Sequence, residues 1–298
     1  MAKNRRKILL AVDSSDQAFE AVRYVSRLFP PNRMEVVLFH VMTKVPESFW
    51  DIEKEPVYRH EVAAIIAWEL QQKKERQEFM KKARRLLLDR NVPEDAVSIK
   101  IQERKVGIAR DIVYESQNDY DGVVVGRWGI SLLKDYLWGS IANKLLGRLT
   151  HIPLCVVGGT PQIGKILVAI DASKGAMRAI DYVGAMADST NWEVTLFHAA
   201  RGPDRERLYK AEKSIESVFE EASRHLEKAG FNRNQITTRM VAGVTSRAVA
   251  ISVEALNGGY GTIVVGRRGL SNVEEFSMGR VSNKVIHMAR EMAVWLVT

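Results

Sequence analysis

The sequence predicts an α/β protein made of two homologous domains, each a doubly wound, five-stranded parallel sheet, and three observations support this. The segment KILLAVDSS at residues 7–15 recurs as KILVAIDAS at residues 165–173, and EVVLFHV recurs as EVTLFHA at the same offset of 158. Near the end of each copy, NKLLGRLTHIPLCVV from Asn143 matches NKVIHMAREMAVWLV from Asn283. Within each copy, short apolar runs alternate with helical patterns, an order typical of parallel strands joined by right-handed crossovers.

The first copy shows this pattern element by element. Five runs predict its strands: ILLAV (8–12), VVLF (36–39), VSIKI (97–101), GVVV (122–125) and LCVV (154–157). The continuous apolar runs are typical of strands buried on both faces, whereas VSIKI alternates as a half-exposed strand does. Helical spacing predicts helices over about residues 18–29 and 60–90, and from about residues 108 and 140. Ser14 or Ser15 stands where the first helix would have its N-cap.

The predicted domains are residues 1–158 and 164–298. The junction between them, GGTPQIG at residues 158–164, is rich in Gly and Pro, which interrupt regular structure. Because the repeat offset falls from 158 to 140, the first copy carries a net 18 extra residues, which we assign to roughly residues 43–75. This insertion is either a lid or dimer contact, or an ordinary helical insertion that packs on its own domain.

Composition restricts the class of partner. The net charge is +8, but residues 1–150 contribute +5 and the remainder +3, so the excess is spread along the chain among acidic residues. This distribution favours solvated helix faces over a nucleic-acid site. The apolar runs fall short of the roughly 18 residues that cross a bilayer, so no membrane partner is expected. A single cysteine, Cys155, and a poor match to a signal peptide predict a cytoplasmic protein.

Two glycine segments carry the main functional signal. The first, GRWGISLLKDYLWGS at residues 126–140, and the second, GRRGLSNVEEFSMGR at residues 266–280, share one glycine spacing. Each begins where a predicted strand ends and finishes where a helix begins. Glycine lets backbone N–H groups approach a ligand, and a helix N-terminus favours an anion. The segments therefore predict a phosphate cradle, although the same glycines also suit a simple strand-to-helix turn.

Two other pairs of polar residues lie where predicted strands end, as the glycine segments do. Asp13 and Asp171 follow the first strand of each copy, where a carboxylate can bind a ribose hydroxyl, a base amino group or a metal-bound water. Capping of the following helix is the alternative for both. His40 and His198 close the second strand of each copy. We interpret them as hydrogen-bonded strand-end residues rather than metal ligands.

The glycine spacing, the KILLAVDSS opening and the LFHV strand together resemble the universal stress protein family, and the duplication resembles its two-domain members. The resemblance implies a strand order of 3-2-1-4-5 in each domain and pairing of the domains through their last strands; a homodimer is left open. Some members of the family bind ATP. Carried over to this sequence, the nucleotide-binding positions are Ala11, Val12, Asp13, Val41, Gly126, Gly129, Gly139, Ser140 and Ile141.

The second copy keeps Ala169, Ile170, Asp171, Gly266, Gly269 and Gly279, and Ala199 follows His198, but it has Arg280 where the first copy has Ser140. Arg280 either folds back to bind phosphate or fills the pocket. The resemblance therefore predicts a regulatory, ATP-binding stress protein, with Mg²⁺ as a possible companion and at most slow hydrolysis. We expect tight occupancy in the first domain and weaker or no occupancy in the second. A scaffold without nucleotide and an adenylylating enzyme are the alternatives.

Overall fold

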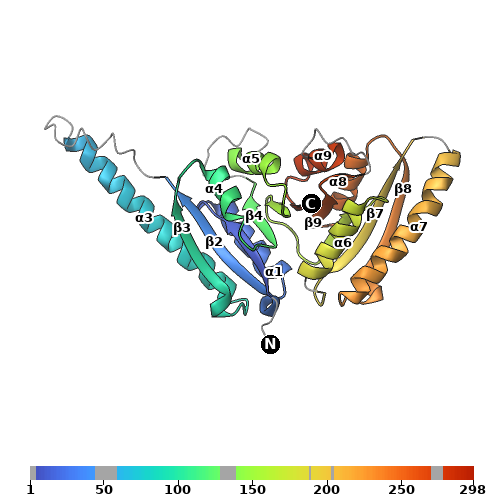
Figure 1. Cartoon of the computed structure of the whole chain (residues 1–298), viewed down its shortest axis with the longest axis horizontal. Coiled ribbons are helices and arrows are strands. Elements are labelled where there is room, and N and C mark those ends of the chain that lie inside the picture. The colour runs from blue at the N-terminus through green and yellow to red at the C-terminus, as the bar shows by residue number, and fades with distance from the viewer. Residues whose placement is uncertain (1–4, 44–58, 128–138, 188, 203–204, 270–277) are drawn as a thin grey trace.

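The computed structural model describes residues 5–43, 59–127, 139–187, 189–202, 205–269 and 278–298 (Figure 1). Its strands form one ten-stranded sheet in the order β3-β2-β1-β4-β5-β10-β9-β6-β7-β8. The strands of the first domain are β1 (Arg6–Ala11), β2 (Met34–Met42), β3 (Val97–Glu103), β4 (Gly122–Gly126) and β5 (Leu154–Val157). Those of the second domain are β6 (Lys165–Ala169), β7 (Glu193–Arg201), β8 (Ile236–Val244), β9 (Thr262–Gly266) and β10 (Ala293–Val297).

Helices cover both faces of this sheet, and a separate hydrophobic core lies under each layer. One layer consists of α1 (Asp16–Leu28), α3 (Arg59–Leu88), α6 (Lys174–Met186) and α7 (Arg205–Lys228). The other consists of α4 (Ile108–Glu115), α5 (Ser140–Arg148), α8 (Arg247–Asn257) and α9 (Arg280–Met288). Short 3₁₀ turns at Pro31–Arg33, Glu94–Ala96 and Arg233–Gln235 precede β2, β3 and β8.

The strand order within each half confirms the predicted doubly wound topology. Strand β1 pairs in parallel with both β2 and β4, and β6 pairs in parallel with both β7 and β9. Each half therefore has the order 3-2-1-4-5. The direction of winding reverses beside β1 and beside β6, and ligands of such folds bind beyond the carboxyl ends of the strands at this point. The predicted domain boundaries remain predictions.

The two halves join through their last strands, as the family resemblance implied. Strands β5 and β10 pair antiparallel, whereas their other neighbours are parallel. In this ladder Cys155 lies directly opposite Trp295. These two residues occupy the same position in the two copies, 140 residues apart, so the pseudo-twofold axis passes between them.

The predicted insertion corresponds partly to the first half of α3, and residues 44–58 lie outside the described residues. Figure 1 shows the N-terminal part of α3 extending beyond the sheet. Its Ile66, Trp68 and Leu70 are 40%, 54% and 62% exposed, whereas Met80 and Leu87 near the other end of the helix are buried. In the turn before them, Val62 is 5% exposed, so this part of α3 is only partly packed. Packing on its own domain remains a prediction. A lid or dimer contact remains a prediction.

Candidate functional site

The end of β1 is fixed to the end of β2 by two hydrogen bonds. The Val12 N–H donates to the carbonyl of Phe39 over 2.9 Å, and His40 Nδ1 lies 2.8 Å from the carbonyl oxygen of Val12. Because a carbonyl oxygen only accepts, Nδ1 carries the proton. His40 is thus a hydrogen-bonded strand-end residue, as predicted, and its bond sets the direction in which the chain leaves β1 toward Asp13.

Burial lowers the pKa of His40 below its ordinary 6.5. The bond to Val12 and the charge of Asp13 act in the opposite direction, while Arg76 on α3 adds to the lowering. His40 is therefore neutral at physiological pH, consistent with a structural donor. Its equivalent, His198, makes the same 2.8 Å contact with the carbonyl of Ile170 in the second domain.

Asp13 is half-buried and organises the start of α1. Its Oδ1 accepts hydrogen bonds from the Ser15 backbone N–H, at 3.2 Å, and from the Ser15 hydroxyl, at 2.6 Å. Ser14 between them has a φ of +67°, which turns the chain sharply. Ser15 is the N-cap of α1 and accepts from the Ala18 N–H. Ser15, not Asp13, therefore caps α1, and Asp13 holds the capping residue in place. A ligand role for this carboxylate stays a prediction.

Gly126 lies where the N-terminus of α1 crosses the end of β4. A Cβ atom at this position would lie 3.1 Å from the carbonyl carbon and oxygen of Gln17 and 3.2 Å from the Ala18 nitrogen. That is tighter than ordinary contacts, so Gly126 has a packing role. The close approach places the end of β4 beside the segment that carries Asp13.

The two ends of the first glycine segment lie side by side. The Gly139 N–H donates to the carbonyl of Arg127 over 3.0 Å, so the start of α5 lies beside the end of β4. Ser140, the first residue of α5, is exposed, and Ile141 is partly buried against the core of this layer. Val41, on β2, is 7% exposed. Gly129 lies outside the described residues.

The N-terminus of α5 has no side-chain cap. Gly139 occupies the N-cap position and offers no acceptor for the first N–H groups. α4 and α9 likewise begin after a glycine without a side-chain cap, whereas Ser15, Ser173 and Ser246 cap α1, α6 and α8 with their hydroxyl groups. Uncapped N–H groups and the helix dipole together attract anions. The first turn of α5, with Gly139 as its N-cap, is called the α5 cradle below.

The second domain repeats the framework of the first. Oδ1 of Asp171 accepts from the Ser173 N–H over 3.0 Å. A Cβ at Gly266 would lie 3.0 Å from the carbonyl group of Gly175, and one at Gly269 would lie 2.9 Å from Oδ2 of Asp171. The Gly279 N–H donates to the carbonyl of Arg267 over 2.8 Å. The glycine segment and the strand-end aspartate therefore meet in this domain, as predicted.

Three side chains nevertheless distinguish the second domain. Ser282, where the first copy has Ala142, is 6% exposed and donates to the carbonyl of Gly266 over 2.7 Å. Nε of Arg247 donates to the carbonyl of Ala199 over 3.2 Å. Arg280 is exposed at the start of α9. Ser282 is thus engaged within the segment and does not stand in for Ser140.

Comparison with known proteins agrees with this geometry. The universal stress protein family model matches residues 4–158 and again residues 162–296. The chain belongs to this family. The two matches make it a tandem, two-domain universal stress protein. Among curated protein sequences, no match to the chain was found.

Solved structures show the same fold along the whole chain. A universal stress protein from Archaeoglobus fulgidus DSM 4304 is 17% identical, with a TM-score of 0.65 over 100% of this chain and 99% of that chain. A functionally unknown protein from Pseudomonas aeruginosa PAO1 is 15% identical, with a TM-score of 0.55 over 99% of this chain and 93% of that chain. At these identities the likeness concerns the fold alone.

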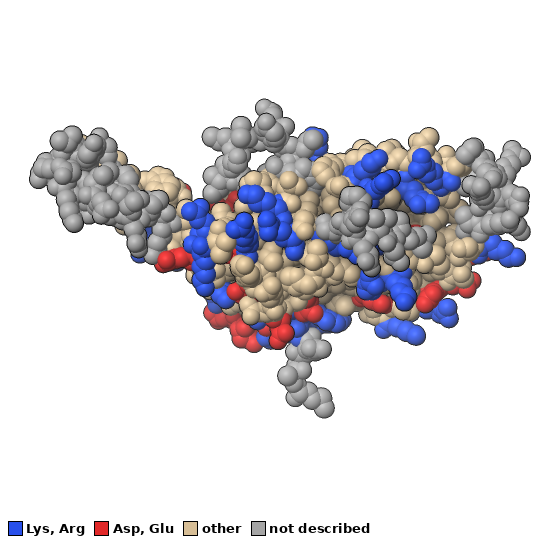
Figure 2. Space-filling model, turned by 45° about the horizontal axis from the view of Figure 1, so that its top comes forward, with Lys and Arg blue, Asp and Glu red and all other residues tan. Residues whose placement is uncertain are grey.

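The helix layer of α4, α5, α8 and α9 gives this universal stress protein a basic surface. Its acidic residues are buried, and each is paired: Asp111 accepts from backbone N–H groups, Glu115 contacts Lys100, and Glu254 contacts Arg239. The exposed charged residues of these helices are all basic: Arg110, Lys144, Arg148, Arg247, Arg280 and Lys284. Figure 2 shows basic side chains across this face of the molecule, including its upper part, whereas acidic ones lie chiefly along the lower rim. Such a potential attracts anions.

Sequence reasoning missed two residues that link the domains. Arg127 and Arg267 follow the first glycine of each segment, and both side chains are buried, at 0% and 4% exposure. Arg127 donates to the carbonyls of Ile286 and Ala289, at 2.8 and 2.7 Å, and Arg267 donates to the carbonyl of Leu146. The only hint in the sequence is that both glycine segments begin with Gly-Arg. The carbonyl groups that these arginines bind lie in the opposite domain, so the sequence does not identify them.

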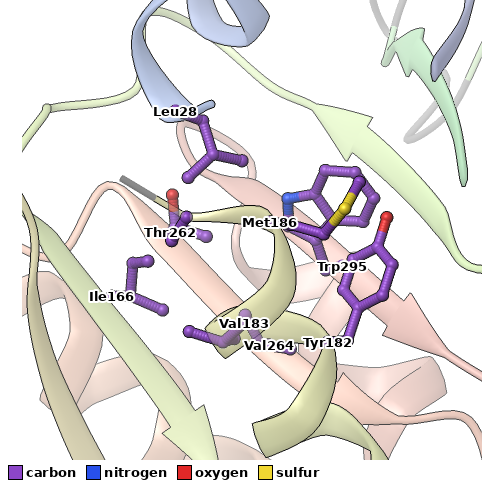
Figure 3. A pocket seen from close by; sticks show the side chains of 9 residues that line it. Leu28, Ile166, Tyr182, Val183, Met186, Thr262, Val264 and Trp295 are labelled. Atoms are coloured by element: carbon purple, nitrogen blue, oxygen red, sulfur yellow. The ribbon is translucent and has the colours of Figure 1, made fainter. Parts of the chain in front are cut away.

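An apolar pocket lies elsewhere, at the domain interface (Figure 3). Its lining includes Leu28 from the first domain and Tyr182, Met186, Thr262 and Trp295 from the second. None of the predicted nucleotide-binding residues lines it. In the described part of the chain, acidic, histidine and cysteine side chains do not gather in threes as a metal site requires, and the helices there are too short or too polar to cross a bilayer.

Proposed function

We propose that this universal stress protein binds ATP or a related adenine nucleotide in its first domain. The bound nucleotide would regulate the conformation or partners of the protein in a cytoplasmic stress response. The observation that carries the proposal is the uncapped α5 cradle, held beside the end of β4 by the bond from Gly139 to Arg127. The α5 cradle lies at the carboxyl ends of the strands, where a doubly wound fold binds its ligands.

The residues present fit such a ligand. The N–H groups of Ser140 and Ile141 and the Ser140 hydroxyl are donors suited to phosphate oxygens. Asp13, with Ala11 and Val12 beside it, would hold the adenosine end, and the backbone of Val41 would contact the base. The basic residues of α4 and α5 would attract the anionic ligand to the carboxyl ends of the strands. Mg²⁺, when bound, would neutralise phosphate charge.

The second domain supports weaker binding or none. Arg280 replaces the small hydroxyl residue, and Asp171, Gly266, Gly269 and Gly279 remain as its candidate ligand-binding residues. Arg247 already occupies the carbonyl of Ala199, the position equivalent to Val41. We therefore propose that the two sites are unequal and that any hydrolysis at the first is slow.

One observation favours a scaffold that binds no nucleotide. The contacts at Gly126 and Gly266 explain these glycines by packing alone, because each lies against the backbone in the first turn of α1 or α6. The two hypotheses differ in calorimetry with ATP: a nucleotide-binding protein gives a binding signal, and a scaffold gives none.

The test is titration calorimetry on the wild type and three variants. Gly139 has a φ of −62°, which valine adopts readily, so Gly139→Val blocks the α5 cradle without backbone strain. We expect about one ATP per wild-type chain and no binding by Gly139→Val. Gly279→Val makes the same change at the start of α9, where a Cβ meets only ordinary contacts of 3.4 Å or more. It should bind ATP as the wild type does.

The third variant controls for effects on the α5 helix itself. A Cβ at Gly147 meets nothing within 4 Å, so Gly147→Ala should stabilise α5 slightly and leave ATP binding intact. If the wild type binds no ATP, the scaffold is correct. Rapid release of ADP or pyrophosphate on incubation would instead identify an enzyme.

A further inference from the structure

Each domain of this protein holds a helix of the other domain through one buried arginine. Arg127, after β4, reaches the last turn of α9, where Nη1 donates to the carbonyl of Ile286 and Nη2 to that of Ala289. Arg267, after β9, reaches the last turn of α5, where Nη2 donates to the carbonyl of Leu146. Residues 127 and 267 occupy the same position in the two copies, as do residues 146 and 286. The two contacts therefore join equivalent residues about the pseudo-twofold axis, through Nη1 of Arg127 and Nη2 of Arg267.

The chemistry of this contact favours a fixed geometry. The carbonyl groups at a helix C-terminus carry partial negative charge and have no partner within the helix. A guanidinium group supplies N–H donors in a planar fork, which restricts the direction of each bond. Burial lowers the pKa of Arg127 to about 10, so this side chain is still charged at neutral pH. A buried charge that loses its partners is strongly destabilising, so the helix ends are held firmly.

The arginine crosses the interface where the chain leaves no room for another side chain. A Cβ at Gly158, in the junction, would lie 2.8 Å from Nε of Arg127 and collide with the carbonyl oxygen of Arg290. The Gly158 N–H also donates to the carbonyl of Met292 over 3.0 Å. The path of Arg127 to α9 is thus built into the junction rather than left to a flexible surface contact.

The helices that the arginines hold begin at the candidate ligand sites. α5 runs from Ser140 to Arg148, nine residues or about 13 Å. Its first turn is the α5 cradle, and its last turn is the one that Arg267 holds. A shift of the last turn of so short a helix moves its first turn as well. In the same way, Arg127 holds the far end of α9, whose first turn carries Arg280.

We propose that Arg267, in the second domain, is a positioning residue for the nucleotide site of the first domain, and that Arg127 positions the equivalent helix start of the second. The start of each of these two helices is thus positioned by a residue from the opposite domain. This inference rests on the proposed nucleotide-binding function. It also gives a direct physical route by which occupancy of one domain affects the other.

Calorimetry with ATP on matched variants tests the proposal. Arg267→Met keeps a flexible, unbranched side chain, shorter than arginine, and removes its donors, and we expect ATP to bind about tenfold more weakly. Arg127→Met makes the same change at the equivalent position and should weaken ATP binding less than threefold. Position in the sequence suggests the reverse ranking, because Arg127 belongs to the glycine segment of the first domain.

A lysine series provides rescue and guards against loss of folding. Arg267→Lys keeps the charge and one donor to Leu146, so its Kd should lie between those of the wild type and Arg267→Met. If the methionine variants do not fold, as judged by near-UV circular dichroism, the ranking of Arg267→Lys against Arg127→Lys decides. Equal or reversed ranking overturns the proposal.

Hydrogen exchange without nucleotide supplies an independent readout. Arg267→Met should increase exchange in α5, and Arg127→Met should increase it in α9. If α5 loosens while ATP affinity stays at the wild-type value, Arg267 is merely structural and the inference fails. If the wild type itself binds no ATP, the proposed function fails instead, so the two failures are distinguishable.

Discussion

The hydroxyl of Tyr24 accepts a hydrogen bond from the indole N–H of Trp295, 2.9 Å away across the domain interface. It also lies 3.0 Å from the hydroxyl of Thr262. Tyr182 is the equivalent tyrosine of the second copy, but its buried hydroxyl has no hydrogen-bond partner in the described structure. It lies beside Gly122, where the other copy has Thr262, and its ring contacts that of Trp295 at a centroid distance of 5.1 Å (Figure 3).

Removing the two hydroxyl groups should have opposite consequences. Tyr24→Phe leaves the Trp295 N–H without its acceptor, so we expect the free energy of unfolding to fall by about 1–3 kcal/mol. Tyr182→Phe removes a buried polar atom that has no partner, so stability should be unchanged or rise by about 1 kcal/mol. Urea unfolding of the two variants makes the comparison. Equal losses would show that the hydroxyl of Tyr182 has a bond that the structure lacks.

Gly122 and Tyr182 should show strong energetic coupling. A Cβ at Gly122 would lie 2.5 Å from the hydroxyl oxygen of Tyr182, so Gly122→Ala should be destabilising by about 1–3 kcal/mol. Adding Tyr182→Phe removes the colliding atom and should recover most of this loss. A double-mutant cycle measures the coupling. Additive effects would contradict the contact.

Acid should destabilise the protein through His40. Because the pKa of His40 in the folded state lies below the 6.5 of the unfolded chain, the unfolded state binds the proton more readily. The free energy of unfolding should therefore fall as the pH decreases from 6.5 toward the folded pKa, and level off below it. His40→Gln should reduce this dependence. NMR titration of the imidazole checks the cause, and a folded pKa at or above 6.5 would refute it.

Replacing Asp13 and Asp171 in turn distinguishes a structural role at the helix start from a role in ligand binding. Both carboxylates accept from the N–H of the serine two residues later, so Asp13→Ala and Asp171→Ala should each cost about 1 kcal/mol of stability. If Asp13 also binds the nucleotide, only its replacement should weaken ATP binding, by about tenfold. Thermal unfolding and calorimetry on the same samples measure both effects. Unchanged ATP affinity in Asp13→Ala would limit this carboxylate to holding Ser15, the N-cap of α1.

Hydrophobic patterning predicted the central elements well, because buried parallel strands leave a strong local signal. The run VSIKI was correctly predicted as a strand, but Ile99 and Ile101 are 41% and 44% exposed. Their strand, β3, lies at the edge of the sheet, so fewer neighbouring residues cover its side chains than cover those of an inner strand. The local sequence around residue 97 does not specify that edge position.

Features of the site that depend on distant segments were harder to predict. The spacing of glycines identified Gly126, but its contact with Gln17 depends on how α1 crosses β4. The capping of α1 by Ser15 was predicted, since a cap is a local bond. The bonds of Arg127 and Arg267 join residues more than a hundred positions apart, and no periodicity in the sequence reports them.

The pair of Cys155 and Trp295 on the pseudo-twofold axis has an evolutionary consequence. In a dimer of identical chains, a residue on the axis faces its own copy, so that two tryptophans or two cysteines would have to fit there together. Fusion of both halves into one chain removes this requirement for self-complementarity. A large ring can then face a small thiol, and each half is free to specialise while the interface between them stays filled.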